Sequence, residues 1–248
     1  MTLADRVLAL PRPLLLALDV DGTLAPIALD PSRARVPEGV EASLRALCDR
    51  EGLVVALVTG RDAAQLDRMV RLERAWRVLE HGRMTLAPGR SASESQVCER
   101  LDALDAWARR EVVPRGARLE RKRASVAVHV RELALRDEAL AQAILSEVRL
   151  EARARGLFAR DGRAVVEVEL DEADKSHAVL ELLERTGAAG LVYAGDDLTD
   201  LPAIQLASKL GIGIFVGSSE RTPPPTKGVE ILDGPGALAA LLEELAAR

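Results

Sequence analysis

The sequence predicts an α/β protein in which the two ends of the chain form one parallel sheet, with a smaller α+β domain inserted between them. Three observations lead to this prediction. Short apolar runs alternate with helical segments in residues 14–82, the β-α-β-α-β order of a parallel sheet. The same alternation returns after residue 174. Between these parts, helices accompany strands with hairpin signals, which indicates an antiparallel sheet.

The first predicted strand carries the strongest chemical signal. Residues 14–18 are five consecutive apolar residues, as in a strand buried on both faces, and Asp19, Asp21 and Gly22 follow. An ordinary Asp-Gly turn would account for the dipeptide alone. In open α/β sheets, however, ligands bind beyond the carboxyl ends of the strands. Two carboxylates at that place indicate a cation and chemistry on an electrophile.

The other elements are predicted from the period of their apolar residues and from the Gly and Pro residues that bound them. In the first part of the chain we expect helices over 37–51 and 62–70 and strands over 53–58 and 78–79. In the inserted part we expect helices over 96–113 and 136–155 and strands over 118–121, 125–130, 157–160 and 164–170. In the last part we expect helices over 174–186, 200–208 and 236–247 and strands over 191–194, 212–216 and 229–232. The core is thus predicted to comprise residues 1–82 and 171–248, and the inserted domain residues 83–170.

Composition excludes several classes of protein. Of the 248 residues, 48% are hydrophobic, 29% are charged and 2% are aromatic, as in a globular protein with an aliphatic core. The few aromatic residues and the net charge of −5 argue against nucleic acid as a partner. Residues 14–18 are too short to cross a bilayer, and no signal peptide is evident. We therefore expect no membrane partner and a cytoplasmic location.

Three further sites lie at predicted strand ends or helix starts. Thr59 follows the strand 53–58, where its hydroxyl and the neighbouring N–H are placed to bind phosphate, although a helix N-cap would also explain it. Lys175 begins a helix, where a cation is unfavourable unless it has an anionic partner. Asp196 and Asp197 end another strand, and carboxylates gathered there repel one another unless a cation such as Mg²⁺ lies among them.

In this order the motifs resemble those of the haloacid dehalogenase-like (HAD) phosphohydrolases: Asp-x-Asp-Gly-Thr, then Thr59, then Lys175, then Gly-Asp-Asp-x-x-Asp. The resemblance implies a Rossmann-like HAD core and Mg²⁺-dependent phosphoryl transfer. It implies that Asp19 is the nucleophile, that Asp21 is the general acid and base, and that Thr59 and Lys175 hold the phosphoryl group. The implied metal ligands, or close neighbours of the metal, are Asp19, Asp21, Asp196, Asp197 and Asp200.

The inserted domain resembles the α/β caps of HAD sugar phosphatases, which close over the site and carry specificity. Several of its strings resemble trehalose-6-phosphate phosphatases in particular, above all ERKRASVAVHVR and the glutamate of VVEVEL. His129 and Arg131 are expected to share a strand face by their spacing of two. By the resemblance, the substrate contacts Gly22, Thr23, Gly60, Arg61 and His81 in the core and Lys122, Ser125, His129, Arg131 and Glu167 in the inserted domain.

The substrate implied is therefore a small sugar phosphate, with trehalose 6-phosphate first. Two departures leave others open: Leu201 and Pro202 follow the last aspartate where that family usually has Glu, and Ser176 follows Lys175 where Gly is usual. Sucrose phosphate or a glucosyl- or mannosyl-glycerate phosphate remains an alternative, as does a phosphomannomutase-like phosphomutase. A receiver domain would have no inserted domain, and a non-catalytic binding module would be expected to lack an acid or the lysine.

Overall fold

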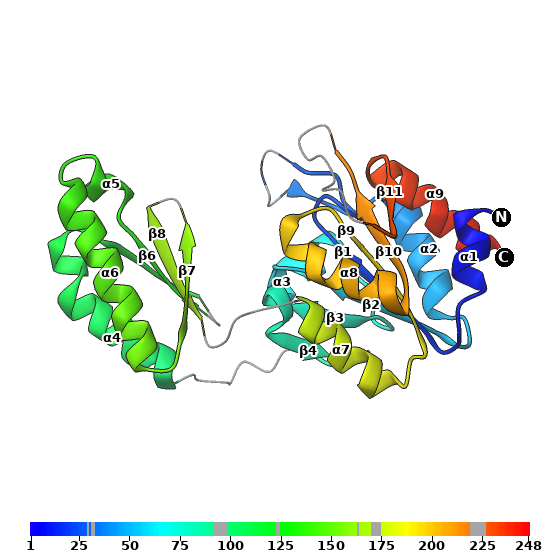
Figure 1. Ribbon diagram of the computed structural model, residues 1–248, viewed down its shortest axis with the longest axis horizontal. Coiled ribbons are helices and arrows are strands. Elements are labelled where there is room, and N and C mark those ends of the chain that lie inside the picture. Colours follow the sequence, from blue (N-terminus) through cyan, green and yellow to red (C-terminus); the bar gives the residue numbers. More distant parts are fainter. Residues whose placement is uncertain are drawn as a thin grey trace. The chain divides into compact units, whose positions relative to one another are not determined.

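The computed structural model divides the chain into two compact units. The first comprises Met1–Ala92 and Asp174–Arg248, and the second comprises Ser93–Ala173. The residues that the structure describes are 1–28, 30, 33–91, 99–122, 125–162, 164–169, 175–218 and 227–248. The predicted helix starts at 96 and 174 lie outside them. Figure 1 shows the helices and strands of each unit.

The first unit contains a mostly parallel sheet. Among the described residues it has seven strands in the order β11-β10-β9-β1-β2-β3-β4, of which β4 alone is antiparallel to its neighbour. The strands are β1 (Leu14–Asp19), β2 (Leu53–Val58), β3 (Trp76–Leu79), β4 (Met84–Leu86), β9 (Gly190–Gly195), β10 (Gly211–Val216) and β11 (Val229–Leu232). The predicted parallel sheet built from both ends of the chain is confirmed.

Helices cover both faces of this sheet, which is why its central strands are continuous apolar runs. The helices are α1 (Leu3–Leu8), α2 (Glu38–Cys48), α3 (Ala63–Met69), α7 (Lys175–Thr186), α8 (Leu201–Leu210) and α9 (Gly234–Ala247), with short 3-10 helices η2 (Glu80–Gly82) and η4 (Leu198–Asp200). Helices α1, α2, α3 and α9 pack on one face and α7 and α8 on the other.

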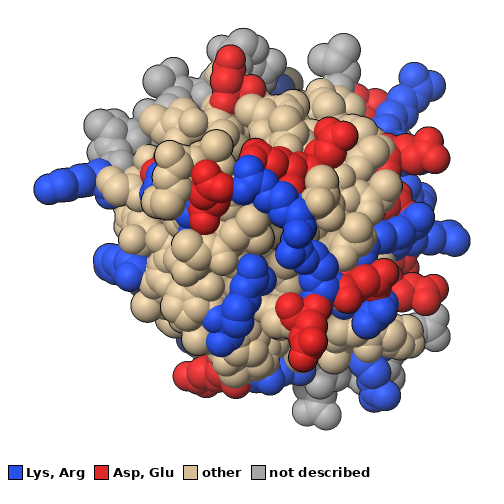
Figure 2. Space-filling model, turned by 90° about the vertical axis from the view of Figure 1, so that its right-hand side faces the viewer, with Lys and Arg blue, Asp and Glu red and all other residues tan. Residues whose placement is uncertain are grey.

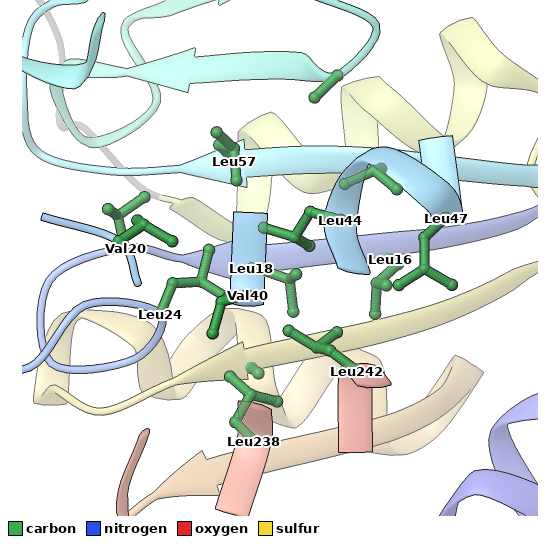
Figure 3. Packing of buried hydrophobic residues seen from close by; sticks show 14 of the residues in the cluster. Leu16, Leu18, Val20, Leu24, Val40, Leu44, Leu47, Leu57, Leu238 and Leu242 are labelled. Atoms are coloured by element: carbon green, nitrogen blue, oxygen red, sulfur yellow. The ribbon is translucent and has the colours of Figure 1, made fainter. Parts of the chain in front are cut away.

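Alternate residues of β1 pack against the helices on opposite faces of the sheet. Leu16 and Leu18 of β1 point toward Leu44 of α2 and Leu242 of α9 (Figure 3). The intervening residues of β1 belong to the apolar cluster of the opposite face, under α7 and α8. All residues of β1 are buried, including the last, Asp19. The strand is therefore a rigid support for whatever follows its carboxyl end.

The order of the strands reverses beside β1. From β1 the chain continues to β2 and β3 on one side, whereas β9, β10 and β11 lie on the other. Such a reversal of strand order is where open α/β sheets bind their ligands, beyond the carboxyl ends of the strands. The ends of β1 and β9 are neighbours in this sheet, because Leu18 pairs with Ala194.

Two elements of the first unit are absent from the sequence-based prediction. Helix α1 is only six residues long, and it is held by a capping box between Thr2 and Asp5. Strand β4 is three residues long and pairs with β3 through Leu79 and Met84. That pairing extends the first unit to residue 92, whereas the sequence placed the boundary at residue 83.

The second unit is a four-stranded antiparallel sheet, in the described residues, with helices on one face. Its strands are β5 (Arg118–Arg121), β6 (Ser125–His129), β7 (Phe158–Gly162) and β8 (Val165–Glu169), in the order β5-β6-β8-β7. Its helices are α4 (Glu99–Glu111), α5 (Arg131–Ala134) and α6 (Glu138–Ala154), with a 3-10 turn η3 (Val113–Arg115). Val126, Val128, Val166 and Val168 form a core with α4 and α6. The alternate residues of β6 and β8 therefore lie on the face away from these helices.

One prediction for this unit is wrong. His129 and Arg131 do not share a strand face, because β6 ends at His129 and Arg131 is the first residue of α5. Val130 leaves the extended conformation, with φ −124° and ψ 16°, and this turn breaks the period of two. Arg131 is exposed there.

Acidic and basic side chains are intermixed on the face of the molecule that Figure 2 shows, as expected from arginines scattered among acids in the sequence. Within the described ranges, none of the helices has the length and the apolar character needed to span a bilayer.

Candidate active site

Three buried aspartates gather at the carboxyl ends of β1 and β9. Asp19 is the last residue of β1, and Asp196 follows β9 directly. Asp200 closes the turn after Asp196. One carboxylate oxygen from each of the three lies within 4.8 Å of the other two, and all three side chains are buried. Residues far apart in the chain are thus brought together by the pairing of β1 with β9.

Lys175 is bonded to this group of aspartates. It is the first residue of α7, is 4% exposed, and donates hydrogen bonds of 2.7 Å from Nζ to Asp19 Oδ1 and to Asp200 Oδ1. A buried ammonium at a helix start would be costly without such partners. The two carboxylates are the anionic partners that a lysine at a helix start requires.

The charges at this site do not balance within the group of aspartates and Lys175, which holds three carboxylates and one ammonium. Burial, together with the charge of Asp200, raises the pKa of Asp19 to about 8. Burial lowers the pKa of Lys175, but the charges of Asp19 and Asp200 outweigh it and the pKa is raised overall. In addition, Asp19 Oδ2 has no hydrogen-bond donor among the described residues. A hard divalent cation such as Mg²⁺ fits this set, because it prefers carboxylate oxygens and supplies the missing positive charge.

Tyr193 belongs to the same network and was not foreseen from the sequence. It lies within β9, fully buried, and its hydroxyl donates a 2.6 Å hydrogen bond to Asp200 Oδ1. Burial, and next the charge of Asp200, raises the pKa of Tyr193 well above its usual value, so the phenol stays protonated and remains a donor. The available signal was a lone tyrosine in an aliphatic strand, because a buried tyrosine hydroxyl needs a partner.

Gly22 and Thr23 pack directly against Asp196. Gly22 has φ +83°, and a Cβ there would lie 2.2 Å from Asp196 Oδ2, so both the backbone and the space require glycine. Thr23 Oγ1 lies 3.5 Å from Asp196 Oδ1. The turn after β1 therefore forms one wall around the second carboxylate of the site.

Residues 59–61, which follow β2, lie close to His81. Thr59 is buried, and its hydroxyl accepts a 3.1 Å hydrogen bond from the Arg61 N–H. It does not cap α3, because Asp62 is the N-cap. A Cβ on Gly60 would lie 2.3 Å from the ring of His81, a residue with φ 60° in η2. Residues 59–61 are thus packed against the turn that follows β3.

Two predicted metal neighbours have their side chains engaged elsewhere. The carboxylate of Asp21 forms a bidentate pair with Arg61 and lies outside the group of three aspartates. Asp197 caps the turn at η4, where its Oδ1 accepts from the Leu198 N–H at 2.7 Å. Asp200 completes this capping box by accepting from the Asp197 N–H at 3.1 Å. Capping of η4 thus accounts for the side chain of Asp197.

Apart from Arg131, which lies in α5, the predicted residues of the second unit lie in two groups on the face of the sheet away from its helices. Glu167 Oε1 accepts hydrogen bonds from Lys122 Nζ at 3.0 Å and from Ser125 Oγ at 2.6 Å. His129 Nε2 lies 3.2 Å from an oxygen of Glu120, which the sequence analysis did not single out. Alternation along β5 could have found Glu120, because it is two residues before Lys122.

Comparison with known proteins agrees with this description. The structure resembles a haloacid dehalogenase-like hydrolase from Bacteroides thetaiotaomicron, with a TM-score of 0.66, 16% identity and coverage of 93% of this chain and 98% of that one. It also resembles Aspergillus fumigatus trehalose-6-phosphate phosphatase, with a TM-score of 0.75, 22% identity and coverage of 99% and 96%. These likenesses show a shared fold, which is that of the haloacid dehalogenase-like (HAD) hydrolases.

The chain belongs to the trehalose-phosphatase family, whose family model matches residues 17–227. Trehalose-phosphate phosphatase of Mycobacterium avium is 32% identical over an alignment of 243 residues, and the match covers 92% of this chain and 61% of that protein. An uncharacterised glycosyl hydrolase of Mycobacterium tuberculosis is 34% identical over 246 residues, 92% of this chain and 18% of that protein. The chain therefore spans less than two thirds of the length of these relatives.

Proposed function

We propose that this protein hydrolyses trehalose 6-phosphate to trehalose and inorganic phosphate, with Mg²⁺ and through an aspartyl-phosphate on Asp19. The observation that carries the chemistry is the buried ammonium of Lys175, which is bonded to Asp19 and Asp200 beside Asp196. Membership of the trehalose-phosphatase family and the likeness to the Mycobacterium avium enzyme support the choice of substrate.

In the first step, a carboxylate oxygen of Asp19 attacks phosphorus and the bond from phosphorus to the sugar oxygen breaks. Asp19 Oδ2 suits this role, because Oδ1 is occupied by Lys175 whereas Oδ2 has no donor in the described part of the chain. Asp21 gives a proton to the departing sugar oxygen, so that trehalose leaves as a neutral alcohol. Lys175 and the hydroxyl of Thr59 hold the oxygens of the phosphoryl group.

In the second step, water attacks the phosphorus of the aspartyl-phosphate and gives a proton to Asp21. The bond from phosphorus to Asp19 breaks, which releases inorganic phosphate and restores both carboxyl groups. Dividing the reaction in this way replaces one difficult displacement with two easier ones. Lys175 stays bonded to Asp200, which in turn is held by Tyr193, so the ammonium keeps its place through both steps.

Mg²⁺ would be held by Asp19 and Asp196, with Asp200 beside them. The resemblance to HAD phosphatases adds the backbone carbonyl of Asp21 as a further ligand. When bound, the ion neutralises negative charge on the phosphoryl oxygens and on the buried carboxylates. This cation would give the unpaired oxygen of Asp19 a partner and would lower the raised pKa of Asp19.

We further propose that the first unit is the catalytic core and that the second unit recognises the sugar. Glu167, Lys122 and Ser125 form a hydrogen-bonded group on the sheet face away from the helices, which also carries the His129–Glu120 pair. Carboxylates and imidazoles in such groups are suited to bind the hydroxyls of a sugar.

A panel of sugar phosphates tests the substrate. We expect phosphate release with Mg²⁺ to be fastest with trehalose 6-phosphate, because the family and the named relative point to that ester. The panel includes sucrose phosphate and the glucosyl- and mannosyl-glycerate phosphates, and the measurement is kcat/KM for each.

Other outcomes of the panel separate the chemistry from the substrate. A preference for another sugar phosphate would keep the phosphatase and reject trehalose 6-phosphate. No release from any ester, together with isomerisation of a hexose phosphate when a bisphosphate activator is added, would show a phosphomutase instead.

Replacing Glu167 or His129 by alanine tests recognition of the sugar. We expect kcat/KM for the preferred sugar phosphate to fall at least about tenfold, the size of one lost hydrogen bond to a charged group. A small aryl phosphate should be affected much less. Glu147→Ala is the matched control, because it removes a carboxylate from α6 on the helical side of the same unit, where Glu147 pairs with Arg115. Equal losses on both substrates would remove Glu167 and His129 from recognition.

A further inference from the structure

Arg61 and Asp21 form a bidentate ion pair near the site. Arg61 Nε donates to Asp21 Oδ2 at 2.7 Å, and Arg61 Nη2 donates to Asp21 Oδ1 at 2.6 Å. The side chain of Arg61 is 14% exposed and that of Asp21 is 41% exposed. Two parallel hydrogen bonds determine the orientation of a carboxylate as well as its distance, which a single contact does not.

The backbones on both sides of this pair are anchored. The Arg61 N–H donates to Thr59 Oγ1 at 3.1 Å, and the Arg61 carbonyl accepts from the Glu80 N–H at 3.0 Å. On the other side, the Gly22 N–H donates to the Ala25 carbonyl at 2.8 Å, which closes the turn that carries Asp21. Hydrogen bonds therefore hold the backbone on both sides of the pair.

Asp21 also lies outside the group formed by the other acids of the site. Asp19, Asp196 and Asp200 form the group that could hold a metal, and Asp21 is not in it, although it is only two residues from Asp19. Within the described part of the chain, the Asp21 carboxylate accepts its two side-chain hydrogen bonds from Arg61. The Asp21 carboxylate is thus paired with a guanidinium and is not part of the group that could hold a metal.

We infer that Arg61 is a positioning residue: its guanidinium holds the carboxyl group of Asp21 in the orientation from which it serves the leaving oxygen. The resemblance to HAD phosphatases assigned Arg61 to the substrate, but the structure engages two of its donors with Asp21. The inference rests on the proposed function, in which Asp21 protonates the leaving oxygen. It predicts that loss of Arg61 slows departure of the alcohol and leaves binding of the ester nearly unchanged.

The first test separates turnover from binding with Arg61→Gln. On the ester that the wild-type protein hydrolyses best, we expect kcat to fall at least about tenfold, which is part of the about 10²–10⁴-fold attributed to general acid–base catalysis. Binding of the same ester, measured by calorimetry, is compared between Asp19→Asn and the double variant Asp19→Asn/Arg61→Gln, in which no turnover interferes. We expect the Kd values to agree within about threefold, less than the loss of one charged hydrogen bond would produce. A Kd weakened in parallel with kcat would show that Arg61 binds the substrate, and would overturn the inference.

The second test varies the leaving group. Phenyl phosphate and p-nitrophenyl phosphate share a ring, but phenol is the more basic leaving group and needs its proton more. We compare kcat/KM, because it covers the steps up to departure of the first product and leaves out hydrolysis of the intermediate. Arg61→Gln should lower kcat/KM for phenyl phosphate more than for the nitrophenyl ester. An unchanged ratio would contradict the positioning role.

Two more variants guard against a purely structural effect. Arg61→Lys should recover part of the lost kcat, because a single ammonium cannot engage both oxygens of Asp21 as a guanidinium does. Arg77→Gln is the matched control: Arg77 is 16% exposed and pairs with Asp67 at 3.1 Å, away from Asp21. It should leave the ratio of the two aryl esters unchanged. A wild-type protein that releases phosphate from none of the esters would reject the proposed function itself, whereas activity with parallel changes in kcat and Kd rejects this inference alone.

Discussion

Asp19→Asn is expected to abolish turnover while leaving the fold intact. The substitution removes the nucleophilic oxygen, so kcat should fall at least about a thousandfold, as when a covalent catalyst loses its nucleophile. Two electrostatic effects on stability oppose each other. One of three clustered carboxylate charges is lost, which relieves repulsion, but Lys175 loses one of its two charged partners. We therefore expect a shift in Tm of less than about 5 °C.

The measurement is phosphate release alongside thermal unfolding. Asp49→Asn is the control, because it is the same chemical change at an exposed ion pair with Arg74, and such pairs contribute little to stability. It should keep its activity. Turnover by Asp19→Asn at near the wild-type rate would remove Asp19 as the nucleophile, whatever the family resemblance implies.

Removal of divalent metal is expected to have the second largest effect. After treatment with EDTA, the rate should fall at least about a hundredfold and return when Mg²⁺ is added, because the reaction then lacks the cation that offsets the charge on phosphate and carboxylates. The group of Asp19, Asp196 and Asp200 carries more negative charge than Lys175 balances.

Binding of the metal can be followed without activity. A cation that binds the folded protein and not the unfolded chain raises stability by mass action, so saturating Mg²⁺ should raise Tm by about 5–10 °C. Asp196→Asn should reduce this rise, and Asp49→Asn should leave it unchanged. Full activity after exhaustive chelation, with no effect of Mg²⁺ on Tm, would exclude these aspartates as a metal site.

The parallel core was predictable because a strand buried on both faces is a continuous apolar run in the sequence. The runs at 14–18, 53–58 and 191–194 are apolar at every position, and β1, β2 and β9 lie there. Short elements leave no such record. Helix α1 is specified by its capping box and by packing, and β4 by its partner β3, so three to six residues carried too little pattern to reveal them.

The sequence by itself determined which residue types stand at the ends of the strands: Asp19 after the first apolar run, Thr59 after the second, and Asp196 after the run at 191–194. Carboxyl ends of parallel strands meet at one edge of a sheet, so their meeting there followed from the order of elements.

Tertiary structure decided which of these polar groups bond to one another. Lys175 reaches Asp19 across 156 residues and Asp21 meets Arg61 across 40, and such pairs depend on strand order and side-chain direction, which no local pattern records. The same holds for Arg131, which a period of two placed on a strand but which the chain carries into α5. Apolar burial acts through many residues and is visible in sequence, whereas a hydrogen bond depends on two atoms and is settled only when the backbone is in place.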